Sequence, residues 1–593
     1  MKNFVKMTLA TLTGLLIFGF VSMFIMIATV GALATLGESQ PVMPAKAVLT
    51  IDMSTMMLGE QTKETDILAS LQGGGEIVAP LGIYSAINAV NKAAQDPAVR
   101  FIYMKPDAMI QGGIAHFEEL RKALENFRTS GKAIVSYIEN PTNGSYYLAS
   151  VSDKVYMTPY DGGINMFTGL SSQMVFLKDI LDRLGVNIQL IRHGRYKSAG
   201  EMFVRSSSSK ENLEQNEAVV DSMWESWAAQ IAESRGITME HLNSILDDLE
   251  LALPADWLEN GLVDELLTRE QLQRKLCDLY VTDNYKDIKA ISIQDYAKLN
   301  SGMNLKAKTK VAVIYAEGNI IDGKDNAQVA GDRFAKLISD VRRDTTIKAV
   351  VLRVNSPGGS VLAAEKIKAE VDLLQERVPV IASFGDYAAS GGYWISAGAN
   401  KIYTDATSLT GSIGVFSVIP DFSGTLDRRL HVNVTSVNSN PHADMYSCLR
   451  PLTKAETAYM QKTVENVYAR FTDIVSEGRG MTTEQVENLA QGRVWTGTEA
   501  VANGLADEIG NIQDALTYAA LSIDGVTSLD DVTVVEYPKP LTTLDLLLES
   551  LGSPAPSAFA GTPFENIGQA FMNAQATETG KTFARLPYEL IIR

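Results

Sequence analysis

The sequence predicts an α/β protein with mainly parallel sheets, in which two tandem copies of one unit follow an N-terminal transmembrane helix. Three observations carry this prediction: an uncharged apolar run near the start, short β-branched runs that alternate with amphipathic stretches, and a long internal repeat. The 593 residues leave room for two or more domains. With 46% hydrophobic and 21% charged residues, the composition excludes a largely disordered chain.

The first predicted element is a membrane-spanning helix over residues 7–36, where no charged side chain occurs. About 20 apolar residues cross a bilayer as a helix. Two lysines precede the run and the first acid, Glu38, follows it, so the positive-inside rule predicts a cytoplasmic N-terminus. The alternative is a signal peptide cleaved at residues 32–34, but the apolar core of a signal peptide usually has about 7–15 residues. We therefore expect residues 1–45 to form a retained anchor.

Two copies of one unit follow the anchor. Asp96–Lys105 resembles Asp344–Arg353 at an offset of 248 residues, and Asn260–Glu265 repeats as Asn503–Glu508 at an offset of 243. Three further matches occur in the same order with offsets of 246 or 247. Such regular spacing indicates a tandem duplication. The predicted division is an anchor, a first repeat, a second repeat and a C-terminal extension: residues 1–45, 46–295, 310–525 and 526–593.

Strands and helices are expected to alternate within each copy. In the second copy, Val311–Ala316, Ala349–Val354 and Val380–Phe384 are apolar runs typical of buried strands. Residues 360–376, between the last two runs, carry apolar side chains at helical spacing. Repeated strand–helix–strand units with Gly-rich turns predict an α/β architecture with parallel pairing.

The composition excludes several classes of function. A net charge of −18 without a basic block argues against nucleic acid as a partner. The two cysteines, Cys277 and Cys448, form no CxxC pair, which excludes a disulfide framework and a Cys-rich zinc site. The five histidines form no HExxH pattern. We therefore expect neither a metal nor another cofactor.

The candidate catalytic residues lie where the two copies differ. Ser390 precedes two glycines on a predicted tight turn that opens a helix, an arrangement that presents a nucleophile. An ordinary N-cap serine is the alternative. Upstream, Asn355–Ser360 ends a strand and begins a helix, so the backbone N–H of Gly359, with that of Gly391, could form an oxyanion hole. A simple helix-entry loop is the alternative here.

A serine nucleophile needs a base, and no histidine lies between His241 and His431. His193 and His442 lie near the repeat offset but outside any recognisable catalytic pattern, and both stay open as candidates. The other base available to serine is a neutral lysine, which needs a desolvated pocket to lower its pKa.

These motifs resemble those of the signal peptide peptidase A (protease IV) family. The resemblance rests on Gly-Asp-Tyr-Ala-Ala-Ser-Gly-Gly-Tyr-Trp around Ser390, on Val-Asn-Ser-Pro-Gly-Gly, on Leu-Thr-Gly-Ser-Ile-Gly-Val, and on Tyr-Lys-Ser-Ala at 196–199. It covers nearly the whole chain and points to the long, duplicated, membrane-anchored bacterial form, a relative of the Clp and crotonase folds. The resemblance implies that Ser390 is the nucleophile, Lys197 the general base and Ser412 a hydroxyl that orients the lysine.

The duplication supports the same pair of residues independently. With the copies aligned, Ser390 corresponds to Asn143, and Lys197 falls near Ala443, where no lysine occurs. Each copy therefore lacks one half of the dyad. One competent site per chain would then form between the two copies.

The resemblance also implies a substrate, partners and a location. The substrates would be remnant signal peptides, cut in their hydrophobic segments by a homotetramer with its active sites inside a bowl. The chain would pass once through the bacterial inner membrane, with its catalytic body on the periplasmic side. Two other classes of protein compete with this hypothesis: a non-catalytic, membrane-tethered oligomeric scaffold and an acyl-CoA enzyme of the crotonase type.

Overall fold

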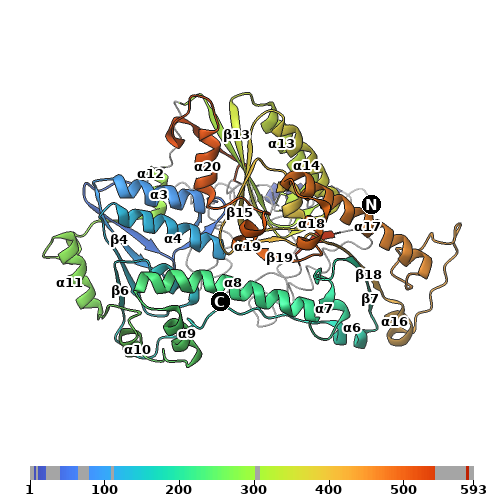
Figure 1. The fold of residues 1–593 in the computed structure, drawn as a ribbon, viewed down its shortest axis with the longest axis horizontal. Coiled ribbons are helices and arrows are strands. Elements are labelled where there is room, and N and C mark those ends of the chain that lie inside the picture. The colour runs from blue at the N-terminus through green and yellow to red at the C-terminus, as the bar shows by residue number, and fades with distance from the viewer. Residues whose placement is uncertain are drawn as a thin grey trace.

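Two α/β units lie side by side in the computed structural model, and α20 packs at the junction between them (Figure 1). The structure describes a few positions between residues 6 and 21 and the following ranges: 41–63, 79–107, 113–300, 307–326, 328–540 and 583–586. Among these residues, no helix has the length and apolar character needed to cross a bilayer. The predicted membrane segment, residues 7–36, lies mostly outside them.

The first repeat forms a six-stranded sheet in the order β8-β6-β5-β4-β1-β9, and every neighbouring pair is parallel. Its strands are β1 (Ala47–Asp52), β4 (Val99–Lys105), β5 (Ile134–Ile138), β6 (Lys154–Met157), β8 (Glu265–Leu266) and β9 (Ala290–Ser292). A separate parallel pair consists of β2 (Met56–Gly59) and β3 (Ala79–Gly82). The helices of the first repeat are α3 (Ile83–Gln95), α4 (Ile114–Thr129), α5 (Asn143–Ala149), α6 (Lys178–Leu184), α7 (Glu201–Val204), α8 (Lys210–Arg235), α9 (Met239–Asp247), α10 (Pro254–Glu259), α11 (Arg269–Tyr280), the 3₁₀ helix η1 (Tyr285–Asp287) and α12 (Ile293–Leu299).

The second repeat forms an eight-stranded sheet along β19-β17-β15-β13-β10-β21, in which β16 also pairs with β15 and β20 pairs with β16. All its pairs are parallel except β17 with β19. Its strands are β10 (Lys310–Glu317), β13 (Ile347–Ser356), β15 (Val380–Ala389), β16 (Lys401–Thr404), β17 (Leu409–Gly411), β19 (Val494–Thr496), β20 (Glu508–Ile509) and β21 (Thr533–Tyr537). Its helices are α13 (Gly331–Arg343), α14 (Val361–Gln375), α15 (Gly391–Ser396), α16 (Ser423–Thr425), η2 (Leu426–Leu430), α17 (Lys454–Arg479), α18 (Thr483–Leu489), α19 (Gly497–Asn503), α20 (Ile512–Leu521) and η3 (Leu529–Asp531).

Helices α8 and α17 show how closely the two copies correspond. Each has 26 residues and begins at a hydroxyl N-cap, Ser209 in α8 and Thr453 in α17, whose side chain accepts a backbone N–H. Each ends at a glycine in the left-handed region, Gly236 at φ 66° and Gly480 at φ 62°. The same local signals therefore set the same helix length in both copies.

Two segments depart from the division that the sequence predicts. Residues 296–299, which that division leaves between the two repeats, belong to the helix α12. Thr533–Tyr537, expected in the C-terminal extension, forms β21 and pairs parallel with β10 as an edge strand. The first copy has the same edge, where β9 pairs parallel with β1. These short edge strands lack the long apolar runs by which the central strands were predicted.

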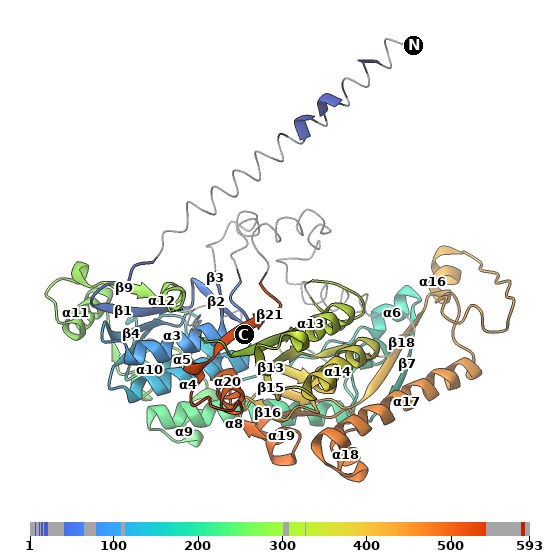
Figure 2. The same cartoon turned by 90° about the horizontal axis from the view of Figure 1, so that it is seen from above.

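A third sheet, in the order β12-β11-β14-β22-β18-β7, joins the two repeats. Its strands are β7 (Asn187–His193), β11 (Ile320–Ile321), β12 (Val329–Ala330), β14 (Gly358–Ser360), β18 (Val415–Asp421) and β22 (Phe583–Arg585). Strand β7 belongs to the first repeat yet lies against β18 of the second, beside α17 (Figure 2). The first repeat thus reaches across to the second through this sheet.

A buried ion network holds the repeats together at a second place. Arg353 on β13 donates from Nε to Glu60 at 2.7 Å and from Nη1 to Glu119 at 2.7 Å. Both carboxylates come from the first repeat, and all three side chains are at most 1% exposed. Apolar packing continues across the same junction, since Val351 belongs to the same core cluster as Leu120 of α4.

Replacing Arg353 by alanine is expected to lower the free energy of unfolding by about 3–5 kcal/mol, because two buried carboxylates lose their arginine partner. Glu60 keeps its contact with His116, whereas Glu119 loses its ion pair. Thermal or urea unfolding measures this effect. Arg342→Ala, which removes a partly exposed ion pair with Glu370, is the control and should cost about 1 kcal/mol or less. Equal losses in both variants would contradict the role of Arg353 at the junction.

Candidate active site

The third sheet brings residues of both repeats to one place. β7 and β18 pair antiparallel, with His193 opposite Val415. Lys197 follows β7 by four residues, and Ser412 precedes β18 by three. Because antiparallel partners place the end of one strand beside the start of the other, the two residues meet at this edge.

The amine of Lys197 lies at the centre of the site. Its Nζ is 2.8 Å from Ser390 Oγ, 2.9 Å from Ser412 Oγ and 2.9 Å from the Ser412 carbonyl oxygen. All three side chains are fully buried. The structure therefore brings together the predicted nucleophile, the predicted base and the predicted orienting hydroxyl.

Ser390 occupies a strained position between β15 and α15. Its φ is 56° and its ψ is −112°, a combination of backbone angles that residues other than glycine rarely adopt. The backbone N–H of Ser390 donates to Gly411 O at 2.8 Å, and its carbonyl accepts from Trp394 N at 2.8 Å. Its hydroxyl makes no N-cap hydrogen bond to α15, so the N-cap alternative is wrong. These bonds fix the hydroxyl toward Lys197.

The electrostatics of the site favour a neutral lysine. Burial disfavours the charged ammonium and holds the pKa of Lys197 well below its ordinary value of 10.5. Within the described ranges, no acidic side chain pairs with Lys197 to oppose this shift. Two glycines let backbone pack against its stem: a Cβ at Gly492 would lie 2.6 Å from Lys197 Cβ, and one at Gly414 would lie 3.2 Å from its Cδ.

The two predicted oxyanion residues also lie together. A Cβ on Gly391 would be 3.1 Å from the backbone N of Gly359, a tighter contact than most side chains make, so glycine favours this close approach. Gly358, the first residue of β14, has a φ of 97°, which glycine adopts readily. Ser360 then caps α14 by accepting from Ala363 N. The loop is therefore also a helix entry, and its glycines face the start of α15.

The two candidate histidines have other partners. His193 stacks on Tyr468 with ring centroids 3.9 Å apart. His442 bonds to Glu456 Oε1 at 2.9 Å and is 54% exposed. In the part of the chain that the structure describes, neither histidine is hydrogen-bonded to Ser390.

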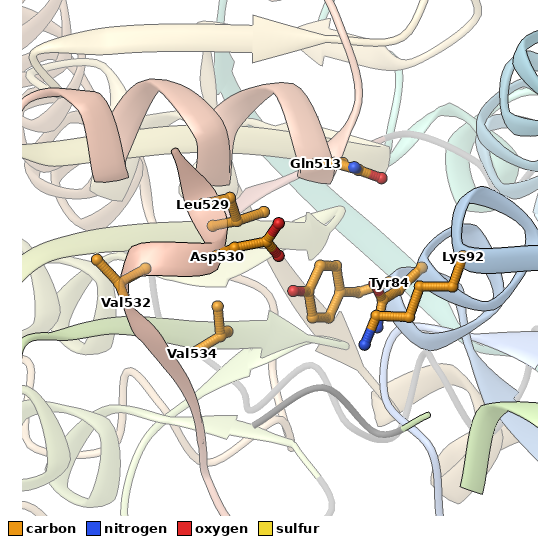
Figure 3. Close-up of a pocket in the computed structure, with 8 residues that line it drawn as sticks. Tyr84, Lys92, Gln513, Leu529, Asp530, Val532 and Val534 are labelled. Carbon is orange, nitrogen blue, oxygen red and sulfur yellow. The ribbon is translucent and has the colours of Figure 1, made fainter. Parts of the chain in front are cut away.

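A cavity of about 160 Å³ lies elsewhere, between α3 and the segment from η3 to β21 (Figure 3). Tyr84, Lys92 and Asp530 are among its lining residues, and none of the predicted site residues lines it. Across the described ranges, no cluster of three His, Cys, Asp or Glu side chains is arranged to hold a metal ion.

Two parts of the site were missed by the sequence analysis. The carbonyl of Ser412 contacts Lys197, which no side-chain motif reveals. Phe583–Arg585 lies in the third sheet directly beside β14, although neither the repeat nor any motif marks this segment.

Known proteins resemble this chain over most of its length. The family model described as peptidase family S49 matches residues 126–281 and 372–524, just over half of the chain. Protease 4 of Haemophilus influenzae is 32% identical over 84% of this chain and 83% of its own length. Protease 4 of Salmonella typhi is 34% identical, over 79% and 76%. The chloroplastic serine protease SPPA of Arabidopsis thaliana is 30% identical, over 78% and 68%. A solved ClpP1 mutant from Listeria monocytogenes overlaps 34% of this chain and 93% of its own at 14% identity, with a TM-score of 0.23, too low to carry an argument.

Proposed function

Since the chain belongs to peptidase family S49 and is a serine protease, we propose that Ser390 and Lys197 form its catalytic dyad. The observation that carries the proposal is the 2.8 Å contact between Lys197 Nζ and Ser390 Oγ in a fully buried pocket. A lysine that is neutral at working pH has a free lone pair and can accept the serine proton.

The proposed reaction is acyl transfer to water. Neutral Lys197 takes the proton from Ser390 Oγ, which attacks the carbonyl carbon of the scissile peptide bond. The backbone N–H groups of Gly359 and Gly391 stabilise the resulting oxyanion. Lys197 then protonates the leaving amine and activates the water that hydrolyses the acyl-enzyme ester. Ser412 positions the amine through the two hydrogen bonds described above.

We further propose that the enzyme is anchored in the bacterial inner membrane and degrades remnant signal peptides on its periplasmic side. The uncharged run over residues 7–36 supports an anchor. An anchored site would meet peptides that remain in the bilayer after secretion.

An assembly of several copies, a homotetramer, belongs to the same proposal. The long segment between β18 and α17 projects from one end of the molecule (Figure 2). It carries exposed apolar side chains, with Val437 96%, Val432 47% and Val434 46% exposed. Exposed apolar side chains gathered on one segment are typical of a contact between protein chains.

Hydrolysis of a synthetic signal peptide by detergent-solubilised protein tests the proposed substrate class. We expect a higher kcat/KM for this peptide than for a polar peptide of the same length that has the same residues on either side of the scissile bond. The reason is that an apolar segment gains binding energy in a matching groove. Equal rates for both peptides would contradict the substrate class and leave the peptidase activity standing. No hydrolysis of either peptide would contradict the proposed chemistry.

A further inference from the structure

The loop that carries Lys197 is neither helix nor strand, and it runs between β7 and α7. A lysine side chain is a long flexible stem, so its amine stays beside Ser390 only if the main chain at Lys197 is fixed. Two backbone bonds fix the N-terminal side of this residue: Lys197 N donates to Gly194 O at 3.2 Å, and Tyr196 N donates to Gln491 O at 2.9 Å. Its carbonyl side is held differently, by a side chain.

That side chain is Arg192 on β7. Its Nη1 donates to the Lys197 carbonyl oxygen at 2.8 Å and to Glu201 Oε1 at 3.0 Å. Arg192 lies five residues before the lysine, and Glu201, the first residue of α7, lies four residues after it. Helix α7 packs beside β7 (Figure 1). The ion pair therefore joins the two ends of the loop and bonds to its middle.

Glu201 gives the arginine a fixed partner. Its side chain is 1% exposed, whereas that of Arg192 is 31% exposed. A buried carboxylate is stable only when its oxygens are paired, and here each oxygen has a partner. Oε1 accepts from Arg192, and Oε2 accepts from the backbone N of Ser209 at 3.1 Å. Because Ser209 is the N-cap of α8, the guanidinium is tied to a helix of 26 residues.

We propose that Arg192 is a positioning residue for the general base: it holds the Lys197 carbonyl, Glu201 holds its guanidinium, and the lysine amine thereby stays in the pocket beside Ser390. This inference rests on the proposed function. Arg192 takes no part in the proton transfer, because it bonds to the main chain of Lys197, whereas the amine at the other end bonds to Ser390 and Ser412. Its effect on catalysis passes through Lys197.

Two consequences of losing Arg192 can be separated. Arg192→Met removes the bond to the Lys197 carbonyl, and it also leaves the carboxylate of Glu201 buried without a cation, which lowers stability. Adding Glu201→Gln removes the unpaired charge, and the amide oxygen can still accept from Ser209 N. In this double variant only the missing bond to Lys197 remains. A purely structural ion pair would regain both stability and activity in the double variant, whereas a positioning residue would regain only stability.

Peptide hydrolysis across a range of pH, measured together with thermal unfolding of the detergent-solubilised full-length protein, tests the inference. Arg192→Met and the double variant should both lower kcat by about 100-fold, the cost of misplacing a reacting group by about 1 Å. KM should change little, because the interaction acts on the base and not on peptide binding. The midpoint of the pH profile should move up toward 10.5, since an amine displaced from the pocket is less desolvated.

Arg235→Met is the matched control. Arg235, the last residue of α8, also bridges a carboxylate and a backbone carbonyl, with Nη1 3.2 Å from Asp264 Oδ2 and Nη2 3.1 Å from Gly261 O. This variant should lower the thermal midpoint and leave both kcat and the pH profile unchanged. Arg192→Lys keeps a cation with a single donor atom, and it should recover part of the kcat that Arg192→Met loses.

A double variant with wild-type kcat would overturn the inference, and so would a loss of kcat without a shift of the pH midpoint. The double variant carries the test if Arg192→Met does not fold. Wild-type kcat in Arg192→Met beside an inactive Lys197→Met would overturn positioning by Arg192 and leave the dyad standing. If Lys197→Met is itself active, the proposed function fails as well.

Discussion

Ser390→Ala is expected to lower kcat for peptide hydrolysis by about 10⁴–10⁶-fold, because no acyl-enzyme can form without the hydroxyl. KM should change little, since Ser390 Oγ contributes to bond making rather than to binding of the peptide main chain. Steady-state hydrolysis of a signal-peptide-like substrate measures both constants. A serine-reactive acylating probe should label wild type and fail to label the variant.

Ser396→Ala is the matched control for this prediction. Ser396 is the last residue of α15, the helix that follows Ser390, and is also fully buried, but its hydroxyl donates to backbone carbonyls of that helix, Gly392 O and Tyr393 O. This variant should keep its activity and its labelling. If Ser390→Ala retains more than a small fraction of wild-type kcat, Ser390 is not the nucleophile.

Lys197→Met is expected to lower kcat by about 10⁴-fold, because the serine loses the group that accepts its proton. Methionine keeps an unbranched side chain of similar length, so the packing against Gly492 and Gly414 is preserved.

In wild type, activity should rise with pH as Lys197 loses its proton. The midpoint should lie below 10.5, because burial lowers the pKa of Lys197. A flat or acid-favouring profile would contradict a lysine base.

The same substitution should stabilise the fold at neutral pH. A folded-state pKa below 10.5 means that the unfolded chain binds more protons between the two pKa values. The free energy of unfolding of wild type therefore falls as the pH drops from 10.5 toward the folded-state pKa, and Lys197→Met removes this loss. A higher thermal midpoint together with lost activity would separate a catalytic role from a structural one. Lower stability at neutral pH would contradict burial of a neutral amine.

Much of this fold could be predicted from the sequence because its central strands are fully buried. Strands that are covered on both faces need continuous apolar runs, and two such runs are Val311–Ala316 and Ala349–Val354. The first lies within β10 and the second within β13. The match of Asp96–Lys105 to Asp344–Arg353 also located corresponding strands, β4 and β13. Of the site, the motif around Ser390 indicated a nucleophile from the residues themselves, whereas Lys197 was identified through the resemblance to the signal peptide peptidase A family, with support from the missing partner in each copy.

Other features depend on contacts between segments far apart in the sequence. The pairing of β7 with β18 brings Lys197 to Ser412, but neither strand carries a signal for its partner. β22 is only three residues long, and what identifies it is its position between β14 and β18. The network around Arg353 joins side chains almost 300 positions apart, such as Glu60. No periodicity or motif reports such distant pairings.

The most direct test of a single dyad built from both repeats of one chain is peptide hydrolysis by four samples. These are wild type, Ser390→Ala, Lys197→Met, and the two variants co-expressed in the same cells. Only wild type should be active, since in the structure Lys197 and Ser390 of the same chain meet at 2.8 Å and no co-expressed chain carries both. Activity of Lys197→Met alone would contradict the dyad. Recovery of activity on co-expression would show instead that the dyad forms between chains.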